Sequence, residues 1–123
     1  MFKNEKVRTN REDSDNGIVS TIDGITKTGA AEEIVETLNW ASKGKVGEVR
    51  VSCNATCTVT IYRNNAEAIG GDTIDGGLIS ANNPIPFVFT VPEPLAAGEW
   101  IIVTVSGLTG GETAIAMIRG WYD

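Results

Sequence analysis

Histidine is absent from this 123-residue chain, and aromatic residues make up only 7% of it. Without histidine, the usual general base for a hydroxyl or thiol nucleophile and the commonest metal ligand are both missing. The sequence also lacks the P-loop signature, and no second cysteine or histidine pair completes a zinc site around Cys53 and Cys57. These absences argue against an enzyme, and we expect no catalytic residues, no cofactor and no bound metal.

Long apolar runs are missing too. No stretch approaches the roughly 20 apolar residues that span a bilayer, and the first residues lack the apolar core of a signal peptide. The net charge of −6 repels phosphate backbones, which argues against a nucleic-acid partner. We therefore expect a single domain that is made and folded in a cytoplasm, with neither a membrane nor a nucleic acid as partner.

Residues 46–62 are the most informative stretch that is present. Apolar and polar residues alternate with a period of two on both sides of 54–56, which is typical of strands half-buried on a core. Turning the chain at 54–56 places every apolar residue on one side. We therefore predict a β-hairpin with three core-facing cross-strand pairs: Cys53 with Cys57, Val51 with Val59, and Val49 with Ile61.

The two cysteines form the first of these predicted pairs. In a reducing compartment we expect two buried thiols that pack as small hydrophobic groups. Directly opposed cysteines are also close enough for a disulfide if the geometry is right, so the redox state stays open.

From residue 33 onward the chain repeats this alternation. Residues 34–40 favour a strand, with a helix over 28–41 as the alternative. Residues 63–84 are rich in turn-forming residues and predict long loops with one or two short strands. Residues 85–91 alternate again, and Pro86 implies an edge strand or an irregular start.

Two strongly apolar stretches follow, and we expect them to form a second hairpin over residues 98–123. Residues 100–105 are apolar on both faces, as in a central strand that is covered on each side. Val88, Ile102 and Val103 place apolar side chains on faces that a two-sheet sandwich alone leaves wet. We therefore expect something to cover these faces, and because residues 100–105 are apolar on both faces we predict a homo-oligomer.

The N-terminal region differs in composition from the rest. Residues 1–16 are dense in charge and poor in apolar side chains, so alone they predict a flexible arm. The apolar run 17–22 can add as a strand to a sheet edge, in its own subunit or in a neighbour. The predicted fold is all-β: a single antiparallel, jelly-roll-like β-sandwich over 33–123, preceded by an extended N-terminal arm over 1–32.

Carboxylates offer two further candidate sites, and neither is convincing. Asp72 and Asp75 lie close in sequence, but the surrounding glycines predict two turns rather than an acid/base pair. Residues 13–17 have the oxygen density of a calcium loop without the spacing or the closing glutamate of an EF-hand. Both are interpreted as solvated polar segments.

The three tryptophans carry more information. Core packing is the simpler interpretation of Trp40 and Trp100, with a protein interface or sugar stacking as the alternative, whereas Trp121 suits a subunit interface, where aromatic residues concentrate binding energy. The predicted oligomer interface consists of Trp100, Ile102, Trp121 and Tyr122.

Taken together, the run Lys43–Tyr62 and the segment Gly98–Asp123 resemble the small jelly-roll decoration (cement) proteins of tailed-phage capsids. The resemblance implies a non-catalytic virion protein, often a homotrimer, on the capsid exterior. It implies that the chain stabilises the capsid by binding across subunits of the major capsid protein, and that an extended arm reaches neighbouring subunits. The arm residues expected to contact the capsid are Lys3, Lys6, Arg8, Arg11, Ile18, Val19 and Ile22.

A second function class stays open at this point. A carbohydrate-binding β-sandwich, either free-standing or as a phage fibre or receptor-binding domain, has the same layout. It would use Trp100, Trp121 or Tyr122 to stack on sugar rings. An exposed row of aromatic residues on one sheet would favour this alternative.

Overall fold

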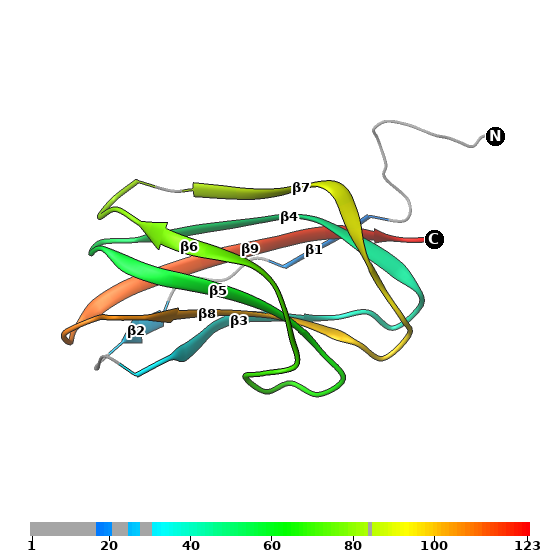
Figure 1. The fold of residues 1–123 in the computed structure, drawn as a ribbon, viewed down its shortest axis with the longest axis horizontal. Helices are drawn as coiled ribbons and strands as arrows, with labels where there is room; N and C mark the ends of the chain where they lie inside the picture. The colour runs from blue at the N-terminus through cyan, green and yellow to red at the C-terminus, as the bar shows by residue number, and fades with distance from the viewer. Residues whose placement is uncertain (1–16, 21–24, 28–30, 84) are drawn as a thin grey trace.

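A computed structural model describes residues 17–20, 25–27, 31–83 and 85–123, which form two antiparallel sheets packed face to face (Figure 1). None of these residues forms a helix with the length and hydrophobicity needed to cross a bilayer. Sheet A contains β1 (Gly17–Ser20) and β2 (Ile25–Lys27), both beside β9 (Glu112–Tyr122), followed by β4 (Gly44–Cys53) and β7 (Ile85–Leu95). Sheet B contains, in order, β3 (Glu33–Asn39), β8 (Trp100–Ser106), β5 (Cys57–Asn64) and β6 (Asp72–Ile79).

The chain changes sheet at nearly every connection from β3 onward. Only β5 and β6 are successive strands that pair with each other; the other connections pass from one sheet to the other. This alternation is the arrangement of a jelly roll and leaves the long strands antiparallel within each sheet. The predicted all-β, jelly-roll-like sandwich is confirmed.

The core lies between the two sheets and is almost entirely aliphatic. Along β9 the even-numbered residues from 114 to 120 are buried and the odd-numbered ones between them are not, as expected of a strand with one face on a core. Trp40, just after β3, is fully buried at one end of the core, as predicted.

The predicted 46–62 hairpin is wrong, although both of its strands exist. β4 pairs with β7 and β9 in sheet A, and β5 pairs with β6 and β8 in sheet B. Val51 is opposite Ala116, and Val59 is opposite Val105. The alternation shows which face of a strand is buried but not which strand lies beside it. Here the two apolar faces meet across the core rather than side by side.

The predicted 98–123 hairpin is wrong for the same reason. β8 is central in sheet B and β9 is central in sheet A, so the connection over 107–111 crosses the sandwich. Gly107, Gly110 and Gly111 in that connection have positive φ angles, which glycine adopts without steric cost.

Two local predictions are confirmed with adjustments. Residues 33–39 form a strand rather than a helix, and a bulge at Val35 turns this side chain into the core. β7 is an edge strand, as Pro86 implied, but it continues past the predicted end at 91 to Leu95. The turn-rich region 63–84 contains one strand, β6, of eight residues.

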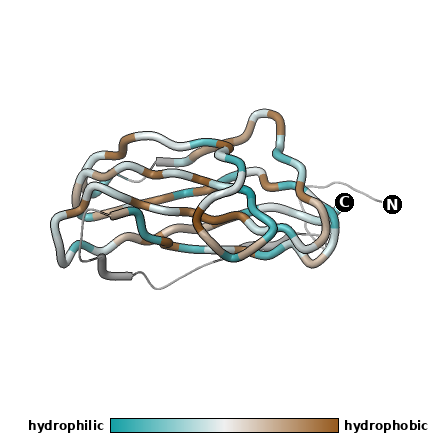
Figure 2. The backbone as a smooth tube through the Cα atoms, turned by 60° about the horizontal axis from the view of Figure 1, so that its bottom comes forward, coloured by the Kyte–Doolittle hydropathy of each residue, from teal (hydrophilic) through white to brown (hydrophobic). Residues whose placement is uncertain are grey.

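The apolar outer side of β8 is covered by the same subunit. Ile102 is 0% exposed although it points away from the inter-sheet core, and Val103 faces that core. The connection between β5 and β6, which we call the 65–71 loop, folds back over the outer side of sheet B (Figures 1 and 2). Within it, Glu67 Oε2 accepts a 2.6 Å hydrogen bond from Thr37, the residue opposite Ile102. The expectation that something covers Ile102 and Val103 is confirmed, but the cover lies within the same subunit, so these two residues do not require an oligomer.

The described part of the N-terminal region joins the subunit's own sheet. β1 and β2 both pair antiparallel with β9, and Ile18 and Val19 are opposite Gly120 and Arg119. We expected the apolar run 17–22 to add to a sheet edge either in its own subunit or in a neighbour. The described residues of this run, 17–20, pair within their own subunit. Several predicted arm residues lie outside the described residues: Lys3, Lys6, Arg8, Arg11 and Ile22, together with the oxygen-rich run 13–16.

Candidate functional surface

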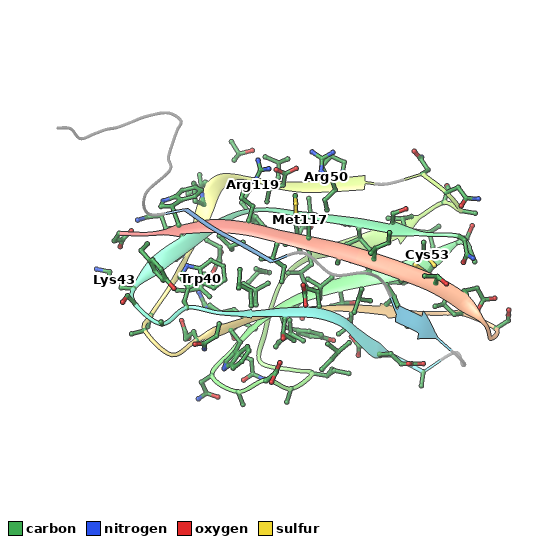
Figure 3. All side chains as sticks on the ribbon, turned by 180° about the vertical axis from the view of Figure 1, so that it is seen from behind. Trp40, Lys43, Arg50, Cys53, Met117 and Arg119 are labelled. Atoms are coloured by element: carbon green, nitrogen blue, oxygen red, sulfur yellow. The ribbon has the colours of Figure 1, made fainter. Side chains whose placement is uncertain are left out.

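The outer side of sheet A is the part of the described surface that most resembles a binding surface. We call it the sheet A face. It points away from the core, as the labelled Arg50, Met117 and Arg119 show (Figure 3). Its members come from the three long strands of the sheet: Gly47, Glu48, Arg50, Val88, Ile115, Met117, Arg119 and Trp121.

The sheet register explains how these residues come together. Because the small and aliphatic residues of β9 face the core, Met117, Arg119 and Trp121 are directed outward. The antiparallel pairing of β4 with β9 then places Glu48 opposite Arg119 and Arg50 opposite Met117.

A charge cluster lies at the centre of the sheet A face. Both Nε and Nη2 of Arg50 donate to Glu48 Oε2, at 3.2 and 2.7 Å, and Nη1 of Arg119 lies 3.7 Å from Glu48 Oε1. The Glu48 side chain is only 14% exposed, whereas those of Arg50 and Arg119 are 53% and 56% exposed. One carboxylate thus orients two guanidinium groups that keep most of their donors for an external acceptor.

Trp121 covers a glycine beside this cluster. A Cβ atom built on Gly47 would lie 2.7 Å from Cζ3 of the Trp121 ring, so the ring rests directly over this backbone position. The backbone of Trp121 is also fixed, because the buried Trp40 donates from Nε1 to the Trp121 carbonyl oxygen at 3.2 Å. The result is a half-buried aromatic platform in a defined position.

Apolar side chains extend the surface toward β7. Val88 is opposite Glu48 and is 62% exposed. Beyond it β7 bulges: Glu93 pairs with Val46 and Val88 with Glu48, so four residues of β7 face a single residue of β4. Val91 lies in this bulge and is 83% exposed. Exposed aliphatic groups beside Trp, Met and Arg match the composition of protein interfaces.

The outer side of sheet B is built differently, because its polar groups bind one another. The Tyr62 hydroxyl donates to Glu32 Oε2 at 2.6 Å. Oγ1 of the fully buried Thr104 lies 2.6 Å from the same oxygen and 3.1 Å from the Thr60 carbonyl oxygen. The hydrogen bond to Glu32, together with burial and the negative charge, raises the pKa of Tyr62.

The sequence-predicted interface residues are not brought together. Trp121 belongs to the sheet A face, and Tyr122 packs against the core. Ile102 is fully buried and Trp100 is half-buried, both on the outer side of sheet B. Sequence reasoning missed Glu48, Met117 and Arg119, because nothing in the sequence shows that β4 and β9 are neighbours.

The acidic candidates serve local structure. Asp72 accepts a 2.8 Å hydrogen bond from Arg63, and Asp75 accepts one from the Gly76 backbone N–H at 2.7 Å. They do not form an acid/base pair. Among the described residues, no group of three or more histidine, cysteine, aspartate or glutamate side chains is arranged to hold a metal ion.

Comparisons with known proteins identify the fold. No family model matches the sequence, and no curated protein matches it. Among solved structures, the chain is similar to a subunit from the structure titled "Bacillus endospore appendages form a novel family of disulfide-linked pili" (12% identity, TM-score 0.51, 98% of each chain covered). It is also similar to the CBM36-1 domain of a multidomain xylanase from the hindgut metagenome of Trinervitermes trinervoides (14% identity, TM-score 0.52, covering 88% of this chain and 98% of that one). At these identities the likeness establishes a β-sandwich fold.

Proposed function

We propose that this chain is a non-catalytic structural protein that decorates a phage capsid from outside and stabilises it by binding across major capsid protein subunits. The observation that carries the proposal is the sheet A face, where the described residues leave two oriented arginines and exposed apolar groups uncovered, while Ile102 at the centre of the opposite sheet is buried within the subunit. The proposed contact on the capsid is an acidic, partly apolar protein surface.

The point at which the N-terminal arm is attached also favours the sheet A face as the surface that contacts the capsid. Residues 1–16 join the described structure at Gly17, which is paired with Trp121 of the sheet A face. The arm is therefore tethered beside the sheet A face at Gly17, so the arm and this face can contact the same capsid. Linked contacts increase the overall affinity, and a ligand that binds only the expanded lattice stabilises that lattice.

Co-sedimentation with capsids tests the proposal. Expanded capsids of the phage that encodes the chain, prepared without it, are mixed with the full-length protein and pelleted. We expect saturable binding to these capsids and not to unexpanded ones. The double variant Arg50→Glu/Arg119→Glu should lose binding while keeping its circular dichroism spectrum. If the wild-type protein stays in the supernatant at micromolar concentrations, the proposal is wrong.

Carbohydrate binding is the second candidate. It is favoured by Trp121, which lies half-buried on the open sheet A face, and the fold is one that a xylanase's carbohydrate-binding module also uses. The predicted aromatic row is not formed, because Trp100, Trp121 and Tyr122 point to different sides. Insoluble xylan in the same assay separates the two functions: retention that is lost in Trp121→Ala would favour carbohydrate binding.

The homotrimer stays a prediction with less support than the sequence suggested. Ile102 and Val103 are satisfied within the subunit, so their apolar character no longer requires a neighbour. Trp121 and the exposed valines of β7 are the remaining candidates for contacts between copies. Analytical ultracentrifugation distinguishes a 13.1 kDa monomer from an oligomer.

A further inference from the structure

The only two cysteines of the chain lie where it passes from one sheet to the other. Cys53 is the last residue of β4 in sheet A, and Cys57 is the first residue of β5 in sheet B. Both are free thiols, both side chains are 2% exposed, and both belong to the inter-sheet core. They are neighbours across the core, as predicted, although not as cross-strand partners in a hairpin.

The backbone around this corner is held by two strands, β9 and β6, and by the turn that follows β6. Asn54 exchanges hydrogen bonds with Thr113, donating its N–H to the Thr113 carbonyl oxygen at 3.2 Å and accepting the Thr113 N–H on Oδ1 at 3.0 Å. The Cys53 carbonyl oxygen accepts the Asn82 N–H at 2.7 Å, and Cys57 is paired with Ile79. These bonds fix the backbone on both sides of the corner, and the two thiols within it are hydrogen-bonded to each other. Joining them therefore requires little further ordering of the chain.

We propose that Cys53 and Cys57 form an intramolecular disulfide when the protein meets a small-molecule disulfide oxidant, and that this bond joins sheet A to sheet B. One thiolate attacks a sulfur of oxidised glutathione and releases one reduced glutathione. The second protein thiolate then attacks the protein sulfur of the mixed disulfide and releases the other. Two protons and two electrons pass from the protein thiols to the oxidant, and the products are one protein disulfide and two reduced glutathiones.

The environment of the pair sets the rate of each step. Burial, the charge of Cys53 and a hydrogen bond to Cys53 raise the pKa of Cys57 to about 11, so little thiolate exists at neutral pH. The first attack also needs local opening, because both sulfurs are buried. The second attack is fast, since the resolving thiol is already a neighbour. Oxidation is therefore slow, accelerates with pH, and does not accumulate the mixed disulfide.

Intact-mass spectrometry of the full-length protein tests this. Reduced wild-type protein is incubated with oxidised glutathione at pH 8 and measured without reductant. We expect a loss of about two mass units with no glutathione adduct, and a melting temperature raised by about 5 °C that dithiothreitol returns to its starting value. Cys53→Ala and Cys57→Ala are the matched controls: each keeps one thiol without its partner and should accumulate a single glutathione adduct.

Three results would overturn the proposal. They are stable glutathione adducts on the wild-type protein, disulfide-linked dimers, and a wild-type protein whose two thiols persist after prolonged incubation. The double variant Cys53→Ala/Cys57→Ala separates the bond from other effects of the oxidant, because its melting temperature should not respond to glutathione.

Discussion

The outer sides of the two sheets differ in how their outward-pointing side chains are covered and paired. In both sheets the central strands carry apolar and polar side chains that point away from the core. On sheet B, Ile102 is fully buried, Glu67 of the 65–71 loop bonds to Thr37 opposite it, and the hydroxyl groups of Tyr62 and Thr104 bind Glu32. On sheet A, no described segment covers Val88, and Glu48 orients its two arginines toward solvent. The difference shows that the central strand β8 of sheet B is covered within the subunit, although Leu78 on the edge strand β6 is 73% exposed, whereas the described residues leave the centre of sheet A open.

The largest expected effect comes from removing a covered residue on sheet B. Ile102→Ala should lower the free energy of unfolding by about 2–5 kcal/mol, because it leaves a cavity at a fully buried position. Val88→Ala on sheet A should cost less than about 0.5 kcal/mol, since the side chain is exposed. Urea denaturation of the two variants measures both values. Equal costs would mean that the two outer sides do not differ in the way we describe.

A smaller loss is expected from the polar cluster on sheet B. Thr104→Val keeps the volume of a fully buried side chain but removes the hydroxyl group that lies beside Glu32 and the Thr60 carbonyl oxygen. We expect a cost of about 1–3 kcal/mol in thermal or urea unfolding. Thr58→Val, at an exposed position of the neighbouring strand β5 on the same outer side of sheet B, is the control and should be close to neutral. A neutral Thr104→Val would show that the cluster adds nothing.

The same cluster predicts a dependence on alkaline pH. The raised pKa of Tyr62 means that the folded state holds the phenolic proton more tightly than the unfolded state. Its contribution is therefore complete below the ordinary tyrosine pKa of about 10 and is lost as the pH rises through the folded value. The stability difference between the wild-type protein and Tyr62→Phe should shrink from pH 9 upward. Cys57 titrates in the same range in both proteins, so it cancels in the difference; a constant difference would contradict the assignment.

How much of this the sequence reveals depends on the range of each interaction. Alternation located β4 and β5 with their buried faces, because a period of two is a local property, and continuous apolar stretches located β8 and β9 without showing which face is buried. Strand partnership is not local: the pairing of residue 50 with residue 117 leaves no trace in either segment. Both hairpin predictions failed for this reason, and the sheet A face could not be assembled without the register.

The cover over β8 was missed for a related reason. The turn-rich composition of 65–71 predicts a loop correctly, but composition does not say where a loop lies. Gly71 now has a physical explanation: it adopts φ +91°, and a Cβ there would lie 2.4 Å from the Arg63 carbonyl oxygen. Gly71, which the sequence marks only as a turn former, is thus required where the 65–71 loop passes close to the backbone of β5.

The central claim is that the sheet A face, rather than the outer side of sheet B, contacts the capsid. Two matched variants test it, since each puts a negative charge in place of an exposed aliphatic residue: Val88→Asp on sheet A and Leu78→Asp on sheet B, where the side chains are 62% and 73% exposed. The measurement is the affinity of each for expanded capsids by quantitative co-sedimentation. We predict binding at least about tenfold weaker for Val88→Asp, equivalent to about 1.4 kcal/mol, and unchanged binding for Leu78→Asp. Equal binding by the two variants, or a loss confined to Leu78→Asp, would contradict the account.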